Sequence, residues 1–224
     1  RPLELANWNG FPKRRATSEA KGKLRGIGIC CFLEIAGGIL NEPANFNVEN
    51  GKAVLRLGVQ EMGQSHLTTY TNLIAKHLGI DTADVALIEG DSADVPGFIP
   101  AVASRSLMMA GSAAVLACDE AVQKGKVIAG ELLEAATDDI EYSNGYFRIT
   151  GTDRNVPLLE LPSRAIEAGA ANFSLDTTYE FVSPQMSFPN GCHVSEVEID
   201  PETGLLTVVG YYACLLYTSD AADE

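Results

Sequence analysis

Residues Gln60 to Thr69 carry the side chains and the spacing best suited to bind a ligand. They follow a strand pattern at Ala53–Val59 and precede a helix pattern that ends at Gly79. Residues 63–65 therefore fall at a helix N-terminus, where the first backbone N–H groups lack partners inside the helix and the dipole is positive. Such a position accepts phosphate or another anion.

Two residues of this turn add to its binding chemistry. Gly63 has no Cβ, so its backbone can approach a ligand closely. The amide of Gln64 offers two donors and one acceptor to a polar ring edge. Glycine at a strand-to-helix turn is also common without any ligand, so a purely structural interpretation stays open.

A second turn with small polar residues precedes another helix pattern. Residues 103–109 open a helix that we expect to reach about Ala136, with Ser104 and Ser106 as candidate N-caps. The first half of this helix is rich in small residues and can pack very close to a neighbour. Two helix N-termini that follow loops raise the expectation of one shared anionic ligand.

Helical spacing predicts which faces of these two helices are buried. For the first helix we expect Leu67, Tyr70, Ile74 and Leu78. For the second we expect Leu107, Gly111, Ala114, Val115, Cys118, Ala121 or Val122, Ile128 and Leu132.

The remaining patterns predict an α+β fold of antiparallel strand pairs packed on helices. We expect a polar and basic connector at residues 7–23, a strand at 24–36, hairpins at 45–59, 140–150 and 192–212, strands at 84–90 and 173–182, and a short helix at 158–168. The hairpin turns are predicted at Glu49–Lys52, at Ser143–Gly145 and at Pro201–Gly204.

Several acidic residues have two interpretations. Glu34 ends an apolar strand, where burial would raise its pKa and suit catalysis, but a strand-end carboxylate is the favoured interpretation. Glu196, Glu198 and Asp200 share one strand face and could bind a metal, but a solvated face is favoured. The three histidines lack metal-ligand spacing, so we expect no metal-binding residues in this chain.

Composition limits the classes of partner. With 46% hydrophobic and 21% charged residues the chain has a globular composition, and its net charge of −14 argues against nucleic acid and anionic membranes. No apolar run is long enough to span a bilayer. Five cysteines without a framework spacing favour reduced thiols and a cytoplasmic location, with periplasmic export of a folded parent as the alternative.

Both ends of the chain look incomplete or foreign. Residues 1–6 read as the end of a helix, which indicates a fragment. Residues 214–224 break the preceding strand pattern and match the translation of a sequencing adapter. We therefore expect three parts, namely a connector from a preceding domain (1–23), a partial domain (24–213) and a non-native tail (214–224).

Six segments in a fixed order carry a resemblance to a known family. They are Leu24–Ile29, Glu34–Gly38, Gln60–Gln64 with His66 and Thr68–Thr69, Ser104–Met109, Phe188–His193 and Val197–Gly204. In combination they resemble the molybdenum-binding large subunit of the xanthine dehydrogenase, aldehyde oxidase and carbon monoxide dehydrogenase family. The resemblance covers nearly all of the chain up to Ala213.

The resemblance implies a molybdopterin cofactor, in its cytosine dinucleotide form, and a parent enzyme that hydroxylates an aldehyde, an N-heterocycle or a similar carbon centre with oxygen from water. It implies 2Fe–2S clusters and FAD on partner subunits or domains, in an oligomeric parent. One pterin-contacting loop then corresponds to Met62, Gly63, Gln64, Ser65 and His66. A second corresponds to Ala103, Ser104, Arg105 and Ser106.

The chain departs from the family at two places. Members commonly have glycine at the position of Ser65 and a glycine-rich stretch where this chain has Phe98–Val102. The family's general-base glutamate falls beyond the C-terminal end, so we expect this fragment to hold no catalytic residue and to be inactive alone. The alternatives are a non-catalytic module that binds an anionic metabolite at residues 63–65 and a degenerate member that has lost the cofactor.

Overall fold

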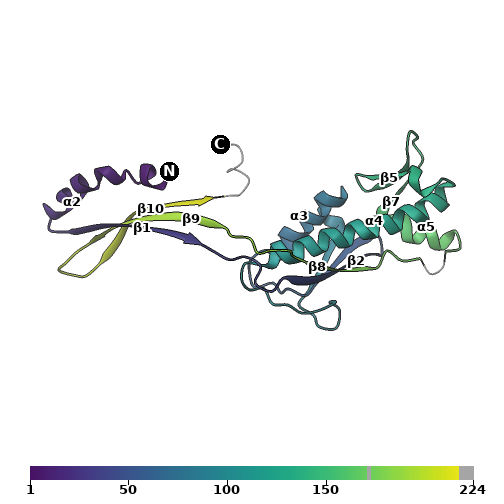
Figure 1. Cartoon of the computed structure of the whole chain (residues 1–224), viewed down its shortest axis with the longest axis horizontal. Coiled ribbons are helices and arrows are strands. Elements are labelled where there is room, and N and C mark those ends of the chain that lie inside the picture. Colours follow the sequence, from purple (N-terminus) through teal and green to yellow (C-terminus); the bar gives the residue numbers. More distant parts are fainter. Residues whose placement is uncertain (171–172, 217–224) are drawn as a thin grey trace. The chain divides into compact units, whose positions relative to one another are not determined.

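A computed structural model describes residues 1–170 and 173–216, which form two compact units. Unit 1 combines residues 1–36 with the chain from Ser187 onward, and unit 2 comprises Gly37–Met186. Figure 1 shows the elements of each unit along the chain. Most of the adapter-like tail, residues 217–224, lies outside the described residues, whereas residues 214–216 continue a strand.

Unit 1 is a three-stranded antiparallel sheet with helices. Its strands are β1 (Leu24–Leu33), β9 (Asn190–Ile199) and β10 (Leu206–Leu216), in the order β1-β9-β10. Its helices are α1 (Pro2–Leu5), a 3-10 turn η1 (Trp8–Gly10) and α2 (Phe11–Glu19). Residues 11–19, which we expected within a connector, are therefore helical.

Helix α2 changes the environment of the acidic row on β9. Glu196, only 2% exposed, accepts hydrogen bonds from Arg14 (2.9 and 2.7 Å) and from Arg25 (2.7 Å). Ser18 donates to Glu198 at 2.6 Å, and Lys23 pairs with Asp200. The prediction of a solvated face was wrong for Glu196, which Arg14 and Arg25 neutralise in a buried position, whereas Glu198 and Asp200 stay partly exposed beside Arg25 and Lys23. Hydrogen bonds from Arg14 and Arg25 lower the pKa of Glu196 although burial opposes them.

Unit 2 is built on a four-stranded mixed sheet in the order β4-β3-β2-β8. The strands are β2 (Asn41–Glu49), β3 (Lys52–Leu57), β4 (Val85–Glu89) and β8 (Thr177–Val182). Strands β3 and β4 run parallel, and the other pairs run antiparallel. The Glu49–Lys52 turn joins β2 to β3 as predicted.

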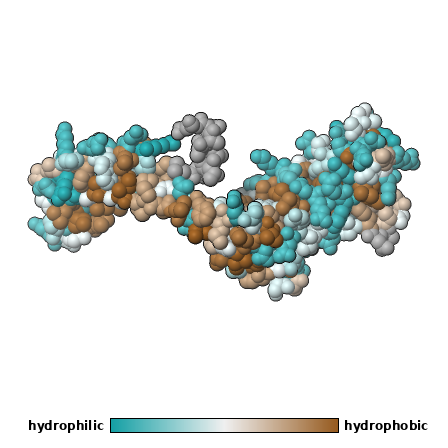
Figure 2. All heavy atoms as spheres, in the orientation of Figure 1, coloured by the Kyte–Doolittle hydropathy of each residue, from teal (hydrophilic) through white to brown (hydrophobic). Residues whose placement is uncertain are grey.

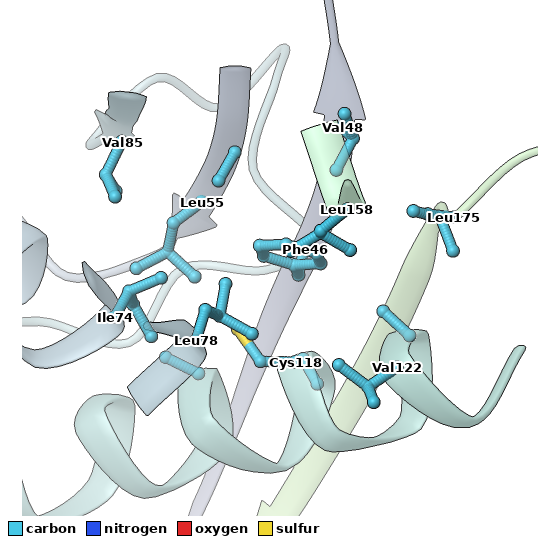
Figure 3. Packing of buried hydrophobic residues seen from close by; sticks show 14 of the residues in the cluster. Phe46, Val48, Leu55, Ile74, Leu78, Val85, Cys118, Val122, Leu158 and Leu175 are labelled. Carbon is cyan, nitrogen blue, oxygen red and sulfur yellow. The ribbon is translucent and has the colours of Figure 1, made fainter. Parts of the chain in front are cut away.

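Two helices pack on this sheet. They are α3 (His66–Leu78) and α4 (Gly111–Leu133), and α4 contacts β2, β8 and α3. Figure 3 shows Phe46 and Leu55 of the sheet facing Ile74 and Leu78 of α3 and Cys118 and Val122 of α4. This close packing confirms the prediction from the small residues of α4, since Ala113, Ala114, Ala117 and Ala121 are fully buried.

The rest of unit 2 surrounds the C-terminal half of α4. A small antiparallel sheet consists of β5 (Ile140–Ser143), β6 (Tyr146–Ile149) and β7 (Asn155–Pro157), followed by α5 (Leu161–Glu167). Short 3-10 turns occur at Thr82–Asp84 (η2), Thr137–Asp139 (η4) and Leu158–Glu160 (η5). Among the described residues, no helix is both long enough and apolar enough to cross a membrane.

Three details of the helices differ from the sequence expectation. Leu67, expected on the buried face of α3, is 60% exposed. His66 takes its place on that face, because it lies four residues before Tyr70 and so on the same side of the helix. Leu107 is 55% exposed. The long helix opens with a π-helical turn, η3 (Ser106–Ala110), and neither Ser104 nor Ser106 caps it with a side chain.

Candidate functional site

Unit 2 contains a cavity of about 560 Å³ between the two predicted loops. Its lining comes from the first loop, from the following turns of α3 and from the second loop. The lining residues are Met62, Gln64, His66, Thr69, Tyr70, Ala101, Val102, Ala103, Ser104, Arg105, Ser106 and Leu107. The structure therefore brings Met62, Gln64 and His66 together with all four predicted residues of the second loop, while Gly63 and Ser65 do not line the cavity.

The N-terminus of α3 is already occupied by a side chain of its own loop. The carboxylate of Glu61 accepts hydrogen bonds from the backbone N–H groups of Gly63 (2.7 Å), Ser65 (3.2 Å) and His66 (2.6 Å). Desolvation raises the pKa of Glu61, but hydrogen bonds from backbone N–H groups, led by those of His66 and Gly63, outweigh it, so the net pKa is lowered. The anion that sequence alone predicts at this helix end is thus supplied internally.

The Gln64 side chain folds back onto the same loop. Its Oε1 accepts from the backbone N–H of Met62, and its Nε2 donates to the carbonyl of Gln60 at 3.1 Å. The side chain of Gln60 in turn accepts from the backbone N–H of Ala101 at 3.2 Å. The first loop is therefore tied both to itself and to the segment that leads into the second loop.

His66 forms the buried wall beside this loop. Its side chain is 5% exposed, its Nδ1 lies 3.0 Å from a carboxylate oxygen of Glu89, and its ring meets that of Tyr70 edge-on at 5.0 Å. Nε2 is buried and has no hydrogen-bond partner within the described part of the chain. Burial raises the pKa of Glu89, and the hydrogen bond from His66 opposes that rise.

Potential ligand atoms of Glu61, His66 and Glu89 all lie within 4.8 Å of one another, the one such group of three or more in the described part of the chain. Glu61 already accepts three backbone N–H groups, and Glu89 pairs with His66. Both carboxylates of the group therefore already have hydrogen-bond partners.

The second loop has a different backbone. Ala103 (φ 52°) and Ser104 (φ 51°) are left-handed, and Arg105 (φ −91°) returns to the right-handed region. The change from a left-handed to a right-handed backbone between Ser104 and Arg105 is of the kind that forms anion-binding nests, and the Arg105 N–H itself donates to the carbonyl of Val102 at 3.1 Å. Within the residues described, neither the Ala103 N–H nor the Ser104 N–H has a hydrogen-bond acceptor. The second loop thus presents the open backbone donors that the first loop lacks.

Arg105 holds the second loop in this conformation. The residue is fully buried, and Nη1 donates to the carboxylate of Glu42. Its remaining contacts are to backbone carbonyls of Gly37 (3.3 Å), Ile39 (3.1 and 3.3 Å) and Asn41 (2.7 Å). Burial raises the pKa of Glu42, and Arg105 opposes that rise. The guanidinium therefore cross-links the loop to the start of β2.

Sequence reasoning missed the residues that organise the cavity. Glu42, Glu61 and Glu89 were not selected, although each lies beside or within a predicted strand or loop. Thr69 and Tyr70 follow His66 at the i+3 and i+4 spacing of one helix face, so this periodicity could have identified them. Tyr70 was expected only as a core residue, but its hydroxyl donates to the carbonyl of Ser106 at 2.8 Å and joins α3 to the second loop.

Residues 98–102, which stand where family members have a glycine-rich stretch, border the cavity. Ala101 and Val102 line it, and Phe98 and Val102 are 58% and 49% exposed. A Cβ atom added to Gly58, directly after β3, would lie 1.9 Å from the carbonyl oxygen of Gly97. Only glycine therefore fits at residue 58. This contact fixes the loop before residues 98–102 against the sheet.

Comparison with known proteins identifies the family of the chain. The family described as "Molybdopterin cofactor-binding domain" matches residues 1–215. The gamma subunit of the 6-hydroxypseudooxynicotine dehydrogenase complex of Paenarthrobacter nicotinovorans is 29% identical over 90% of this chain and 26% of its own length. The carbon monoxide dehydrogenase large chain of Hydrogenophaga pseudoflava is 28% identical over 94% of this chain and 28% of its own.

Solved structures show the same fold. Quinoline 2-oxidoreductase from Pseudomonas putida 86 matches with a TM-score of 0.81 and 27% identity, over 95% of this chain and 29% of that chain. The Cu,Mo-CO dehydrogenase matches with a TM-score of 0.77 and 27% identity, over 94% of this chain and 29% of that chain. The chain thus spans less than a third of the length of these relatives. It belongs to the molybdopterin cofactor-binding domain family.

Proposed function

We propose that this chain is part of the large subunit of a molybdenum hydroxylase and that unit 2 supplies part of its molybdopterin site. The observation that carries the proposal is the single cavity that gathers both predicted loops. The names of the relatives, a carbon monoxide dehydrogenase large chain and a dehydrogenase complex subunit gamma, support an oxidoreductase within a multi-subunit complex.

The residues of the cavity fit a pterin dinucleotide. The N–H groups of Ala103 and Ser104 would hold the pyrophosphate, because neither has an acceptor among the described residues. The hydroxyls of Ser104 and Ser106 and the amide of Gln64 would contact the pterin edge, and Met62 and Tyr70 would cover its face. Arg105 would act as a positioning residue, since its guanidinium already contacts Glu42 and three carbonyl groups.

When bound, such a cofactor supplies a metal centre that accepts two electrons while oxygen from water enters a carbon substrate. In this proposal the present chain binds and orients the cofactor. The cytosine dinucleotide form, the iron–sulfur and FAD partners, an aldehyde or N-heterocycle as substrate, and a cytoplasmic location complete the proposal. They rest on the resemblance of the motifs and, for the location, on the cysteine pattern.

The alternative of an anionic metabolite at residues 63–65 is less well supported. The carboxylate of Glu61 accepts the N–H groups that such a metabolite would need. An external anion at this turn would have to displace Glu61 against its three hydrogen bonds. The open N–H groups of the second loop offer a site without that displacement.

The decisive experiment uses the full-length large subunit, recovered from the same source and expressed with its neighbouring subunits. Molybdenum and the pterin nucleotide are measured by mass spectrometry on the purified protein. We expect both in wild type, a lower content in Gln64→Ala, and no change in Gln123→Ala, an exposed position on α4. A folded full-length protein without molybdenum would favour the degenerate alternative, and unchanged content in Gln64→Ala would remove the role assigned to Gln64.

A further inference from the structure

Cys31 and Cys192 lie directly opposite each other on the paired strands β1 and β9 of unit 1. Both thiols are free. In an antiparallel pair of strands, residues that oppose each other point to the same side of the sheet. The two sulfur atoms are therefore neighbours on one face, although the residues lie far apart in the chain.

The backbone hydrogen bonds show which kind of cross-strand pair these residues form. The register of β1 and β9 continues beyond the two strands, where Ala36 and Ser187 exchange two backbone hydrogen bonds of 2.9 and 3.2 Å. Bonded and non-bonded pairs alternate along an antiparallel ladder. Cys31 lies an odd number of residues before Ala36, so Cys31 and Cys192 form a non-hydrogen-bonded pair. In such a pair the Cα atoms are about 4.5 Å apart and the side chains are close, which falls within the Cα range of about 4.4–6.8 Å for a disulfide.

The two thiols differ in access and in ionisation. Cys31 is exposed, whereas Cys192 is half-buried. Burial raises the pKa of Cys192, and its hydrogen bond with Cys31 raises that pKa further. Ile29 and Val194 are apolar neighbours on the same face, and Figure 2 shows hydrophobic residues gathered over the strands of this unit. Because the thiolate is the reactive form, Cys31 meets an oxidant first and Cys192 completes the bond.

A third thiol competes for Cys192. Cys214 of β10 lies opposite Cys192 on its other side, within the segment that matches an adapter. A residue of a middle strand directs its backbone N–H and C=O groups to one neighbouring strand, so Cys192, which is not bonded to β1, faces β10 with them. Cys192 and Cys214 then form the wider kind of pair, with Cα atoms about 5.5 Å apart and side chains farther apart. Cys31 is therefore the favoured partner of Cys192.

We propose that Cys31 and Cys192 are a redox-active pair that forms a reversible disulfide and locks β1 to β9. The oxidant is a low-molecular-weight disulfide. The Cys31 thiolate attacks one of its sulfur atoms and releases one small thiol, and the Cys192 thiolate then attacks the Cys31 sulfur and releases the second. The two protein thiols lose two protons and two electrons, which convert the small disulfide into two thiols.

The position of the pair in the chain gives the disulfide a consequence. Strand β1 precedes Gly37 and β9 follows Met186, so the bond closes a loop that contains all of unit 2. A disulfide that closes a long loop restricts the unfolded chain. It also keeps β1 and β9 adjacent when their ladder opens, so the hydrogen bonds between Ala36 and Ser187 should break less often.

Oxidised glutathione is the probe for the first test. The 224-residue chain, in a Cys214→Ser background, is treated with it, alkylated, digested without reduction and analysed by mass spectrometry. We expect a peptide pair joined through Cys31 and Cys192, which a dithiol reductant separates. Cys30→Ser is the matched control and should keep this cross-link, because Cys30 is also exposed but lies opposite His193. Cys192→Ser should instead retain glutathione on Cys31.

Several results of this test would overturn the proposal. They are a folded chain without the cross-link, glutathione retained on Cys31 while Cys192 stays free, and a cross-link that survives in Cys31→Ser. With Cys214 restored, a predominant bond between Cys192 and Cys214 would also overturn it. The same peptide map of the full-length large subunit should show the Cys31–Cys192 bond, and its absence there would contradict the proposal.

Hydrogen exchange gives an independent readout of the locked strands. We expect oxidation to slow the exchange of the Ala36 and Ser187 amides several-fold, because the cross-link holds β1 beside β9. Cys31→Ser, treated with the same oxidant, is the control and should show no slowing. If these amides exchanged equally fast in the oxidised and the reduced chain, the pair would not lock the strands and the proposal would be wrong.

Discussion

The two loops that line the cavity of unit 2 share a left-handed backbone before a helix but have opposite hydrogen-bonding states. Each places left-handed residues just before a helix, at Gly63 and Ser65 in the first loop and at Ala103 and Ser104 in the second. In the first loop Glu61 accepts the N–H groups at the helix end. In the second, the N–H groups of the two left-handed residues have no acceptor among the described residues.

The difference lies in whether the chain itself supplies an acceptor for the N–H groups before a helix. In the first loop the acceptor, Glu61, lies two to five residues before its donors, so closure is a local event. In the second loop the shape depends on Arg105 and Glu42, which are 63 residues apart. The open loop is therefore maintained by contacts between residues far apart in the chain, whereas the hydrogen bonds that close the first loop come from within it.

The largest expected effect comes from removing the cross-link of the second loop. Arg105→Met leaves the carboxylate of Glu42 buried without its partner, which should lower the free energy of unfolding by about 3–5 kcal/mol. Urea denaturation of the 224-residue chain measures this change. Arg164→Met is the control, since Arg164 pairs with Glu160 at an exposed position and should cost at most about 1 kcal/mol. Similar losses in both variants would mean that the buried pair does not hold the loop.

Titration with pyrophosphate should separate the two loops directly. In wild type we expect the backbone amide resonances of Ala103 and Ser104 to shift, because their N–H groups are free, and those of Gly63 and Ser65 to stay unchanged. In Glu61→Ala the resonances of Gly63 and Ser65 should also respond, because the internal carboxylate is gone. NMR spectra of the labelled chain provide the measurement. If only the resonances of Gly63 and Ser65 shifted in wild type, the first loop would be the one open to an anion and the interpretation would be wrong.

The stability that the first loop gains from the hydrogen bonds of Glu61 should depend on pH. The folded-state pKa of Glu61 lies below its ordinary value of 4.5, so its contribution to stability is present above about pH 4.5 and is lost as the pH falls through the lower folded-state value. The stability difference between wild type and Glu61→Gln should therefore be largest near neutral pH and shrink below pH 4.5. Thermal unfolding at pH 7 and at pH 3.5 measures it. If the stability difference between wild type and Glu61→Gln grew at low pH, the stabilising group at the N-terminus of α3 would not be the ionised carboxylate of Glu61.

The smallest expected effects concern the left-handed residues themselves. Ser65→Gly and Ser104→Gly each replace a residue with positive φ by one that adopts it freely, which should stabilise the chain by up to about 1 kcal/mol. Chemical denaturation of both variants gives the two values. Ser112→Gly, within α4, is the control and should destabilise by a similar amount. A loss of stability in Ser104→Gly would mean that its side chain, rather than its backbone, holds the second loop.

Local patterns were sufficient for most elements of the fold. The β2–β3 hairpin, the helix stop at Gly79 and the small-residue packing of α4 were predicted correctly, because each depends on the preferences of neighbouring residues. The exposed Leu67 and the buried His66 were not predicted. Both positions satisfy helical spacing relative to Tyr70, and only the sheet beneath the helix selects between them.

The acidic residues of β9 show the same limit. Alternation correctly placed Glu196 and Glu198 on one side of the strand, but the sequence could not show that α2 would bring Arg14 to that side. The prediction of a solvated face failed because helix 11–19 was read as a connector. Ion pairs between residues 182 positions apart leave no periodic signal in the chain.

The sequence by itself determined the family, the order of the motifs and the two loops that meet in the cavity. Tertiary structure decided which of these loops is open to an anion, through the contacts of Arg105 with Glu42 and with the carbonyls before β2. The physical reason is range: turn and helix preferences act over a few residues, whereas the pairing and burial of polar groups depend on residues that only the fold brings together.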